Sequence, residues 1–247
     1  MEHRFFIEEP KDITIIKEKE TLKHIKVLRL KEKDKIIILD GKCGRFKGEI
    51  EKIGKEECIV KITKKEKLKP PPIEITLIQG IPKHPKMDLI VEMLGGFSIK
   101  RIIPLIAKRS IPKKENIERL RNIAKSSFLT SGSYLLCSIS NCLSLDRAIE
   151  EIKGDDLIIV PWEEEKKTHF KPVLASHKSS KKISVFIGPE GGFDKEEIES
   201  IQKIGGISVS LGDAIIKTEY AGFFVISSIL YEFSPYNLKY GIRGSGK

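Results

Sequence analysis

A glycine-rich turn, GPEGG at residues 188–192, is the first place in this chain where chemistry is expected. It follows a short apolar run at 185–187 with strand character, and helical periodicity begins after it. Asp194 fits an N-cap position and Glu197 its capping-box partner, so the order is strand, glycine loop, helix. Such a loop lets a ligand approach backbone amides that the first helical turn leaves without intrahelical partners.

The spacing of these glycines narrows the kind of ligand. It matches neither the dinucleotide pattern GxGxxG nor a Walker motif, so a phosphate-binding nucleotide fold is not predicted. A ligand held by backbone amides and carbonyls, such as an adenosine, fits better. A turn without a ligand is the alternative, because glycine is common in turns of any function.

Two further turns follow predicted strands. Pro161-Trp162 comes after the strand predicted at 157–160, and Gly212-Asp213 comes after the strand predicted at 207–211. In open parallel sheets, ligands bind outside the carboxyl ends of the strands. We therefore expect these two turns and the glycine loop to meet in one pocket.

The part of the chain after residue 72 alternates strand and helix patterns, which predicts a mainly parallel sheet with helices on both faces. The predicted strands are 75–78, 102–105, 157–160, 185–187 and 207–211, and the predicted helices are 87–93, 115–128, 195–204 and 215–233. The last helix has almost no polar face, so it is expected to be buried. It could be buried in the core of the domain or in an interface between two subunits, and the sequence favours neither.

Three consecutive prolines at 70–72 favour an extended linker and mark the clearest domain boundary. Before these prolines the patterns predict one helix at 19–30. They also predict strands at 4–7, 36–39, 46–50 and 58–62. This content indicates a small β-barrel. The predicted domains are 1–70 and 73–240, and the glycine-rich end at 241–247 is predicted to be a flexible tail.

Charge and composition limit the class of protein. The net charge is +10, and residues 1–72 hold 20 Lys and Arg against 14 Asp and Glu, which favours a polyanionic partner. Growth at high temperature would also enrich Lys and Glu. The four cysteines form no CxxC pair and the histidines no HExxH frame, so no metal site is expected. No apolar stretch approaches the roughly 20 residues of a membrane span, so a cytoplasmic location is expected.

Three motifs of the second half, in this order and spacing, resemble the RsmE family of ribosomal RNA methyltransferases in the SPOUT superfamily. They are GPEGGF at 188–193, LG at 211–212 and KTEYA at 217–221. The stretches HRFF at 3–6, HIKVLR at 24–29 and DG at 40–41 look like the opening domain of that family. The resemblance covers about residues 3–233, nearly the whole chain.

The resemblance implies a PUA-like β-barrel followed by an α/β domain with a deep trefoil knot, and it implies a homodimer. The implied reaction is methyl transfer from S-adenosylmethionine to N3 of a uridine in 16S ribosomal RNA, with free RNA or the small ribosomal subunit as partner. The implied cofactor contacts are Pro161, Ile187, Gly188, Pro189, Glu190, Gly191, Gly192, Leu211, Gly212 and Ile216. The alternative is a non-catalytic RNA-binding relative that keeps the fold and the cofactor pocket.

The reaction needs the uridine N3 to lose its hydrogen and the resulting anion to be stabilised. The candidate catalytic residues are Arg109, Lys217, Thr218 and Glu219, and the candidate RNA contacts are Arg4, Lys26, Arg29 and Arg45. Arg109 could instead be a solvated charge without a catalytic role. Thr218 and Glu219 could instead be an ordinary start of a helix. The chain departs from the family pattern at 92–98 and 129–133, and Ala214 and Lys217 stand where the family commonly has arginine. Lysine lacks the bidentate fork of arginine, so cofactor binding is better supported than catalysis.

Overall fold

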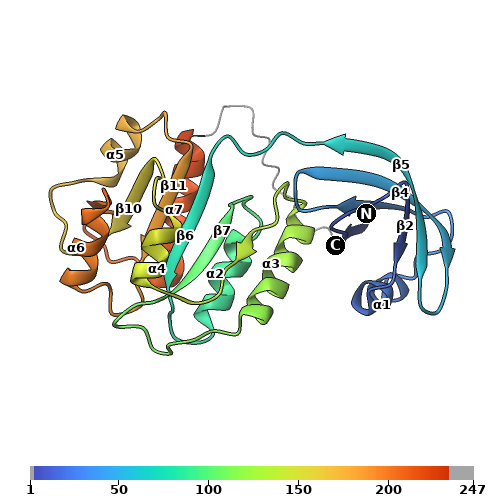
Figure 1. The fold of residues 1–247 in the computed structure, drawn as a ribbon, viewed down its shortest axis with the longest axis horizontal. Helices are drawn as coiled ribbons and strands as arrows, with labels where there is room; N and C mark the ends of the chain where they lie inside the picture. Colours follow the sequence, from blue (N-terminus) through green and yellow to red (C-terminus); the bar gives the residue numbers. More distant parts are fainter. Residues whose placement is uncertain (1–2, 234–247) are drawn as a thin grey trace. The chain divides into compact units, whose positions relative to one another are not determined.

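The structure is a computed structural model that describes residues 3–233, so the tail predicted at 241–247 lies outside the described residues. The chain forms two compact units. Within the described residues, one comprises residues 3–71, Asp88–Ile102 and Asn116–Ser140, and the other comprises Pro72–Met87, Ile103–Glu115 and residues 141–233. Figure 1 labels the helices and strands. No helix within residues 3–233 combines the length and the apolar character that crossing a membrane requires.

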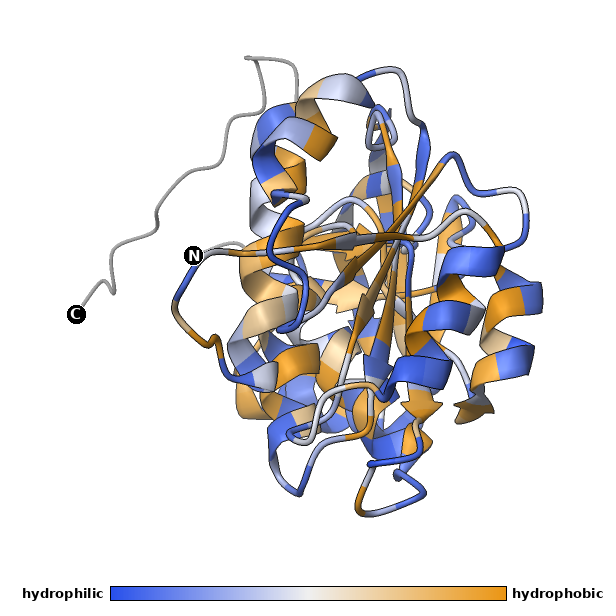
Figure 2. Ribbon diagram, turned by 90° about the vertical axis from the view of Figure 1, so that its left-hand side faces the viewer, coloured by the Kyte–Doolittle hydropathy of each residue, from blue (hydrophilic) through white to orange (hydrophobic). Residues whose placement is uncertain are grey.

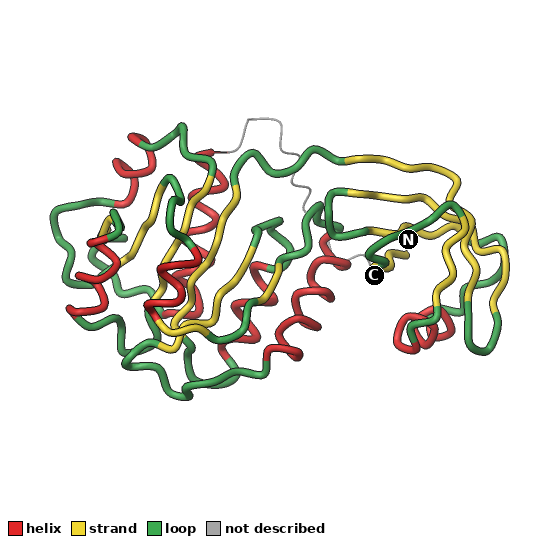
Figure 3. Tube along the Cα trace, viewed as in Figure 1, coloured by secondary structure: helices red, strands yellow, loops and turns green. Residues whose placement is uncertain are grey.

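A five-stranded sheet with the order β1-β3-β4-β5-β2 lies within residues 3–67, where Figure 3 shows strands, one helix and the loops between them. Its elements are β1 (His3–Phe6), β2 (Ile13–Ile16), α1 (Lys19–Val27), β3 (Lys35–Leu39), β4 (Gly44–Ile53) and β5 (Cys58–Lys67). β1 pairs with β3 in parallel, and the other pairs are antiparallel. Phe5, Ile38, Ile50 and Val60 form the centre of its core.

The predicted elements of this region are confirmed, with two differences. β2 was not predicted, because Thr14 and Ile16 are buried while Ile15 is half exposed, an alternation too short to stand out in four residues. α1 ends at Val27 and not near residue 30, because Arg29 adopts a left-handed backbone with φ 55° that ends the helix.

A seven-stranded sheet follows, with the order β12-β10-β11-β6-β7-β8 and with β9 also paired to β7. The strands are β6 (Glu74–Gly80), β7 (Arg101–Ile106), β8 (Ser138–Ile139), β9 (Leu143–Ser144), β10 (Leu157–Pro161), β11 (Lys182–Ile187) and β12 (Ile207–Val209). The central pairs β6–β11, β10–β11 and β10–β12 are parallel, as predicted. Their carboxyl ends therefore meet at one edge of the sheet.

Six helices accompany this sheet: α2 (Lys86–Leu94), α3 (Ile117–Ser131), α4 (Leu145–Glu151), α5 (Phe170–Ser176), α6 (Lys195–Lys203) and α7 (Thr218–Phe233). Figure 2 shows apolar strands between helices whose outward stretches are polar. The four predicted helices are present. α4 and α5 were missed because seven residues are only two turns, too few for a clear helical period.

The last helix differs from its prediction in two ways. α7 begins at Thr218 and not at 215, and it packs against β6, β11 and α5. Within one chain α7 is not buried on every side, so the domain core does not cover the whole helix. Its exposed side chains are aromatic, namely Tyr220, Phe223, Phe224 and Tyr231, and Tyr231 is 87% exposed. Because the opposite face holds Val225 and Ile229 in the core, the exposed stripe is a second apolar face.

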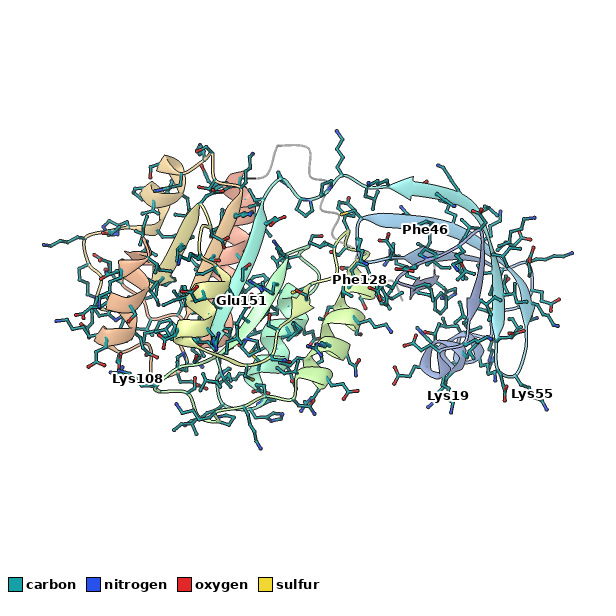
Figure 4. All side chains as sticks on the ribbon, in the orientation of Figure 1. Lys19, Phe46, Lys55, Lys108, Phe128 and Glu151 are labelled. Carbon is teal, nitrogen blue, oxygen red and sulfur yellow. The ribbon has the colours of Figure 1, made fainter. Side chains whose placement is uncertain are left out.

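Arg4, a predicted RNA contact, caps a helix in this structure. Its Nη1 donates to the carbonyl oxygen of Leu129 at 3.0 Å and to that of Thr130 at 2.9 Å, in the last turn of α3. These carbonyls have no intrahelical partner, and a guanidinium also balances the negative end of the helix dipole. The neighbouring Phe6 packs edge-on against Phe128, which is labelled in Figure 4. β1 is thus tied to the end of α3.

We expect Arg4→Met to lower the free energy of unfolding by about 1.5–3 kcal/mol, since it removes hydrogen bonds from a charged donor. Urea unfolding followed by circular dichroism measures the change. Arg147→Met, on the exposed surface of α4, is the matched control and should change stability by less than about 0.5 kcal/mol. Equal stability of the two variants would contradict the capping role.

Candidate functional site

A single cavity of about 510 Å³ lies at the carboxyl ends of β10, β11 and β12. Its walls are residues 161–163, the glycine loop at 187–193 and the segment 210–219, together with Lys86, Lys166 and Ala221. All the cofactor contacts expected from the resemblance line it: Pro161, Ile187, Gly188, Pro189, Glu190, Gly191, Gly192, Leu211, Gly212 and Ile216. The three strand-end turns therefore do meet in one pocket.

The glycine loop is tightly folded against itself. A Cβ on Gly188 would lie 3.1 Å from Cα of Gly192 and 3.1 Å from N of Phe193, and Gly192 has φ 67°. A Cβ on Gly80, at the end of β6, would lie 2.6 Å from Pro189. A Cβ on Gly80 would not fit unless Pro189 moved, and a Cβ on Gly188 would press on main-chain atoms more tightly than most real contacts, so both positions favour glycine. Main-chain atoms consequently form this wall of the cavity.

The helix after the loop begins as predicted. The Asp194 carboxylate accepts a hydrogen bond from N–H of Glu197 at 2.8 Å, and the Glu197 carboxylate accepts one from N–H of Asp194 at 3.0 Å. The capping box is confirmed. Glu197 is buried and also accepts from N–H of Lys108 at 2.8 Å, so the same side chain holds the loop after β7. Lys108, labelled in Figure 4, forms an ion pair with Asp194 at 2.9 Å.

Thr218 joins the start of α7 to the glycine loop. Its hydroxyl donates to the carbonyl oxygen of Gly188 at 2.6 Å and accepts from Nε2 of Gln79 at 3.0 Å. The hydrogen of this hydroxyl is thus committed to a backbone carbonyl. Gln79 was not predicted as a site residue, and the only signal was an amide within an otherwise apolar strand pattern.

A lysine and two carboxylates stand together at the cavity wall. Nζ of Lys86 lies 3.0 Å from Oε1 of Glu190 and 3.4 Å from Oε2 of Glu219. Glu219 is only 7% exposed, and Glu190 also accepts from N–H of Lys83 at 3.0 Å. The hydrogen bond to Glu190 is the main cause that raises the pKa of Lys86. Burial raises the pKa of Glu190, but the bonds from Lys86 and from backbone N–H groups outweigh it and lower that pKa overall.

Two family descriptions match the chain. The description "RNA methyltransferase domain" matches residues 69–230, and "RNA methyltransferase PUA domain" matches residues 16–63. The ribosomal RNA small subunit methyltransferase E of Rickettsia conorii is 31% identical, with 82% of this chain and 83% of that protein covered. The chain belongs to this methyltransferase family.

Other proteins match this chain over nearly their whole length. The ribosomal RNA small subunit methyltransferase E of Aquifex aeolicus is 28% identical over 92% of this chain and 99% of that protein. The crystal structure of the Neisseria gonorrhoeae enzyme of the same name, bound to S-adenosyl methionine, has a TM-score of 0.85 at 21% identity, with 94% and 98% of the two chains covered. A putative methyltransferase from Legionella pneumophila, in complex with bound SAM, gives a TM-score of 0.83 at 22% identity, with the same coverage of the two chains. These two structures show that the fold is shared.

Three of the four candidate catalytic residues line the cavity, and the fourth does not. Lys217, Thr218 and Glu219 all line the cavity, and Lys217 is exposed there. Arg109 lies outside the lining, and its Nη1 donates to the carbonyl oxygen of Gly191 at 2.7 Å. Arg109 therefore holds the glycine loop through the carbonyl of Gly191. Lys86 lines the cavity but was not predicted, because nothing in its neighbourhood distinguishes it from other surface lysines.

The remaining candidate RNA contacts of the methyltransferase lie around the five-stranded sheet. Lys26 is in α1 and donates to the carbonyl oxygen of Lys55 at 3.4 Å, and Arg29 follows that helix. Arg45 lies on β4 in register with Glu66. Their role toward RNA stays a prediction.

The capping box of Asp194 and Glu197 predicts how the stability of the methyltransferase depends on pH. The pKa of Asp194 is lowered, first by the hydrogen bond from Lys108 and then by that from N–H of Glu197. A carboxyl group with a lowered folded-state pKa contributes its full stability above the unfolded value of about 3.9, and this contribution is lost as pH falls through the lowered value. Asn caps a helix about as well as Asp, so Asp194→Asn isolates the charge.

We therefore expect the melting temperature of Asp194→Asn to lie below that of the wild type by a constant amount from pH 7 to about pH 5, and this difference should shrink toward zero below about pH 4. Thermal unfolding followed at each pH measures it. A difference that persists unchanged at about pH 2 would show that the charge is not its cause.

Proposed function

We propose that this chain transfers a methyl group from S-adenosylmethionine to N3 of a uridine in small-subunit (16S) ribosomal RNA. The observation that carries the proposal is the meeting of three strand-end loops in one cavity beside the buried carboxylate of Glu219. The names of the family members and the cofactor named for the Neisseria structure support the substrate and the methyl donor. Action on ribosomal RNA would require a cytoplasmic location.

The cavity fits the proposed cofactor by size and by the chemistry of its walls. About 510 Å³ lies within the range of about 300–1,000 Å³ that small-molecule sites occupy. Backbone of the glycine loop, where a Cβ on Gly188 would meet main-chain atoms at 3.1 Å, offers amides and carbonyls to an adenosyl group. Apolar side chains such as Ile187 and Leu211 supply packing surface for the adenine ring.

The cofactor supplies an electrophilic methyl group when bound. Glu219 accepts the N3 proton of the uridine, because its carboxylate is the buried anion at the cavity wall. Lys217 stabilises the charge that develops on the uridine carbonyl oxygens. Thr218 does not move a proton in this scheme, because its hydroxyl hydrogen is held by Gly188. Arg109 acts by fixing the loop through Gly191.

The domain roles belong to the same proposal. Residues 1–70 form a PUA-like RNA-binding domain in which Lys26, Arg29 and Arg45 contact phosphates, a role that the PUA match and the positive charge of this region support. Residues 73–240 form the methyltransferase domain, with the deep trefoil knot of the SPOUT superfamily. The parallel sheet and the packing of α7 on β6 and β11 agree with that topology.

The exposed aromatic stripe of α7 supports a homodimer. Tyr220, Phe224 and Tyr231 repeat at helical spacing and are 50%, 43% and 87% exposed, which is unusual for large apolar rings. We expect Phe224→Glu to convert the dimer to a monomer in sedimentation velocity, because a buried unpaired carboxylate opposes association. Glu199→Gln, on the exposed face of α6, is the control. A wild type that sediments as a monomer would refute the dimer.

Transfer of a labelled methyl group into small subunits that lack the modification tests the proposed reaction. Mass mapping of the product should place one methyl group on N3 of a uridine. Measurable cofactor binding without any transfer would instead favour the non-catalytic relative considered above.

A further inference from the structure

Lys86 is the first residue of α2, and its side chain reaches two carboxylates that belong to different elements. Glu190 comes from the glycine loop and Glu219 from the first turn of α7, and their oxygens lie 3.0 Å and 3.4 Å from the same Nζ. All three residues line the cavity. The ammonium is therefore a bridge between the loop proposed to hold the cofactor and the carboxylate proposed to take the proton.

The charge of Glu219 depends on this bridge. Its Oε2 is buried and has no hydrogen-bond partner among residues 3–233, so the nearby ammonium is the group that balances its negative charge there. Glu219 is buried while Glu190 is partly open to solvent. Two carboxylates brought together at one place repel each other, which raises the pKa of at least one of them. An intervening cation removes that repulsion and favours the ionised form of both.

We infer that Lys86 is a positioning residue for methyl transfer, which keeps Glu219 ionised and links it to the glycine loop through Glu190. This inference rests on the proposed function, since only an ionised Glu219 can accept the N3 proton. Lysine suits the role because a compact ammonium with three donors serves two carboxylates that approach from different elements.

Removal of the ammonium has a specific consequence. In Lys86→Met the two carboxylates face each other without a cation, so the pKa of Glu219 should rise by about one unit or more. The acid limb of the pH profile of single-turnover methyl transfer should move upward by the same amount, so that transfer is reduced about tenfold at pH values below the acid limb of the wild type and is largely recovered near pH 9. Lys86→Arg keeps the positive charge and should retain most of the transfer.

A second variant separates charge balance from loss of packing. Adding Glu190→Gln to Lys86→Met removes one of the two negative charges, while the amide oxygen can still accept from N–H of Lys83. The double variant should therefore regain transfer on the acid limb of the profile relative to Lys86→Met. A purely structural role would predict a further loss, because two contacts are removed. Lys83→Met, which leaves that backbone bond intact, is the control for a lost surface lysine.

The pKa of Glu219 is read without any activity by selective ¹³C labelling of glutamate carboxyl groups. The Glu219 resonance is assigned by its absence in Glu219→Gln, and its titration midpoint should be higher in Lys86→Met than in the wild type. An unchanged midpoint would overturn the inference.

If the wild type binds cofactor but transfers no methyl group, the proposed reaction fails, whereas the carboxyl titration still decides the role of Lys86. If transfer by Lys86→Met drops equally at every pH and Glu190→Gln does not rescue it, the inference on Lys86 would also be overturned.

Discussion

Gly188→Val is expected to weaken cofactor binding at least about 30-fold, equivalent to about 2 kcal/mol. The nearest atoms to a Cβ at this position are main-chain atoms of Gly192 and Phe193, all 3.1 Å away. Backbone cannot rotate aside as the end of a side chain can, so a branched residue must push the loop open. The displaced loop would also lose the bond between its Gly188 carbonyl and the hydroxyl of Thr218.

Isothermal titration calorimetry with S-adenosylmethionine measures this loss, and thermal unfolding shows that the variant is folded. Gly205→Ala is the control, because Gly205 has φ 89° and a Cβ there would touch nothing within 4 Å. This control carries only the strain of a left-handed backbone, about 1–2 kcal/mol of stability, and should leave cofactor affinity unchanged. Affinity of Gly188→Val within about threefold of the wild type would show that the loop is not the cofactor wall.

Glu219→Gln is expected to slow methyl transfer by about 10²–10⁴-fold while cofactor affinity changes only a few-fold. The substitution keeps the shape of the side chain and removes the carboxylate that is 7% exposed at the cavity wall. A neutral amide cannot accept the N3 proton, and it also leaves Lys86 with one carboxylate partner in place of two. The effect should therefore fall on the chemical step and not on binding.

Single-turnover transfer with saturating cofactor and RNA measures the chemical step directly. Glu232→Gln is the matched control, since Glu232 lies on the same helix but pairs with Lys178 at 3.0 Å, outside the cavity lining. We expect wild-type rates for this control. Transfer by Glu219→Gln at a rate near that of the wild type would mean that another group accepts the proton.

Much of the site was predictable because its motifs are local. A strand, a glycine turn and a capped helix are encoded by neighbouring residues, so the loop at 188–192 and the capping box of Asp194 and Glu197 were found from their order alone. The alternation of strands and helices likewise predicted the parallel sheet. Since parallel strands end at a common edge, the meeting of three turns in one pocket followed from that sheet.

Long-range contacts could not be predicted in this way. Arg4, a candidate RNA contact, caps α3 about 125 residues away, and Thr218, a candidate catalytic residue, donates a hydrogen bond to Gly188. Neither contact is visible from the neighbouring residues in the sequence. Lys86 reaches Glu190 and Glu219 only because α2, the glycine loop and α7 start at the same edge of the fold.

The amino-acid sequence alone determined the element types, the strand-end turns and the family. Propensity, capping and turn chemistry act between residues that are close in the chain, so they can be read from the sequence. Tertiary structure alone decides which charges face one another and which are buried. Lys86 and Glu219 are separated by more than 130 positions, and their ion pair exists only because the fold brings them within 3.4 Å. The exposed stripe of α7 is also a tertiary result, since packing on β6 and β11 covers one apolar face of that helix and leaves the aromatic face open.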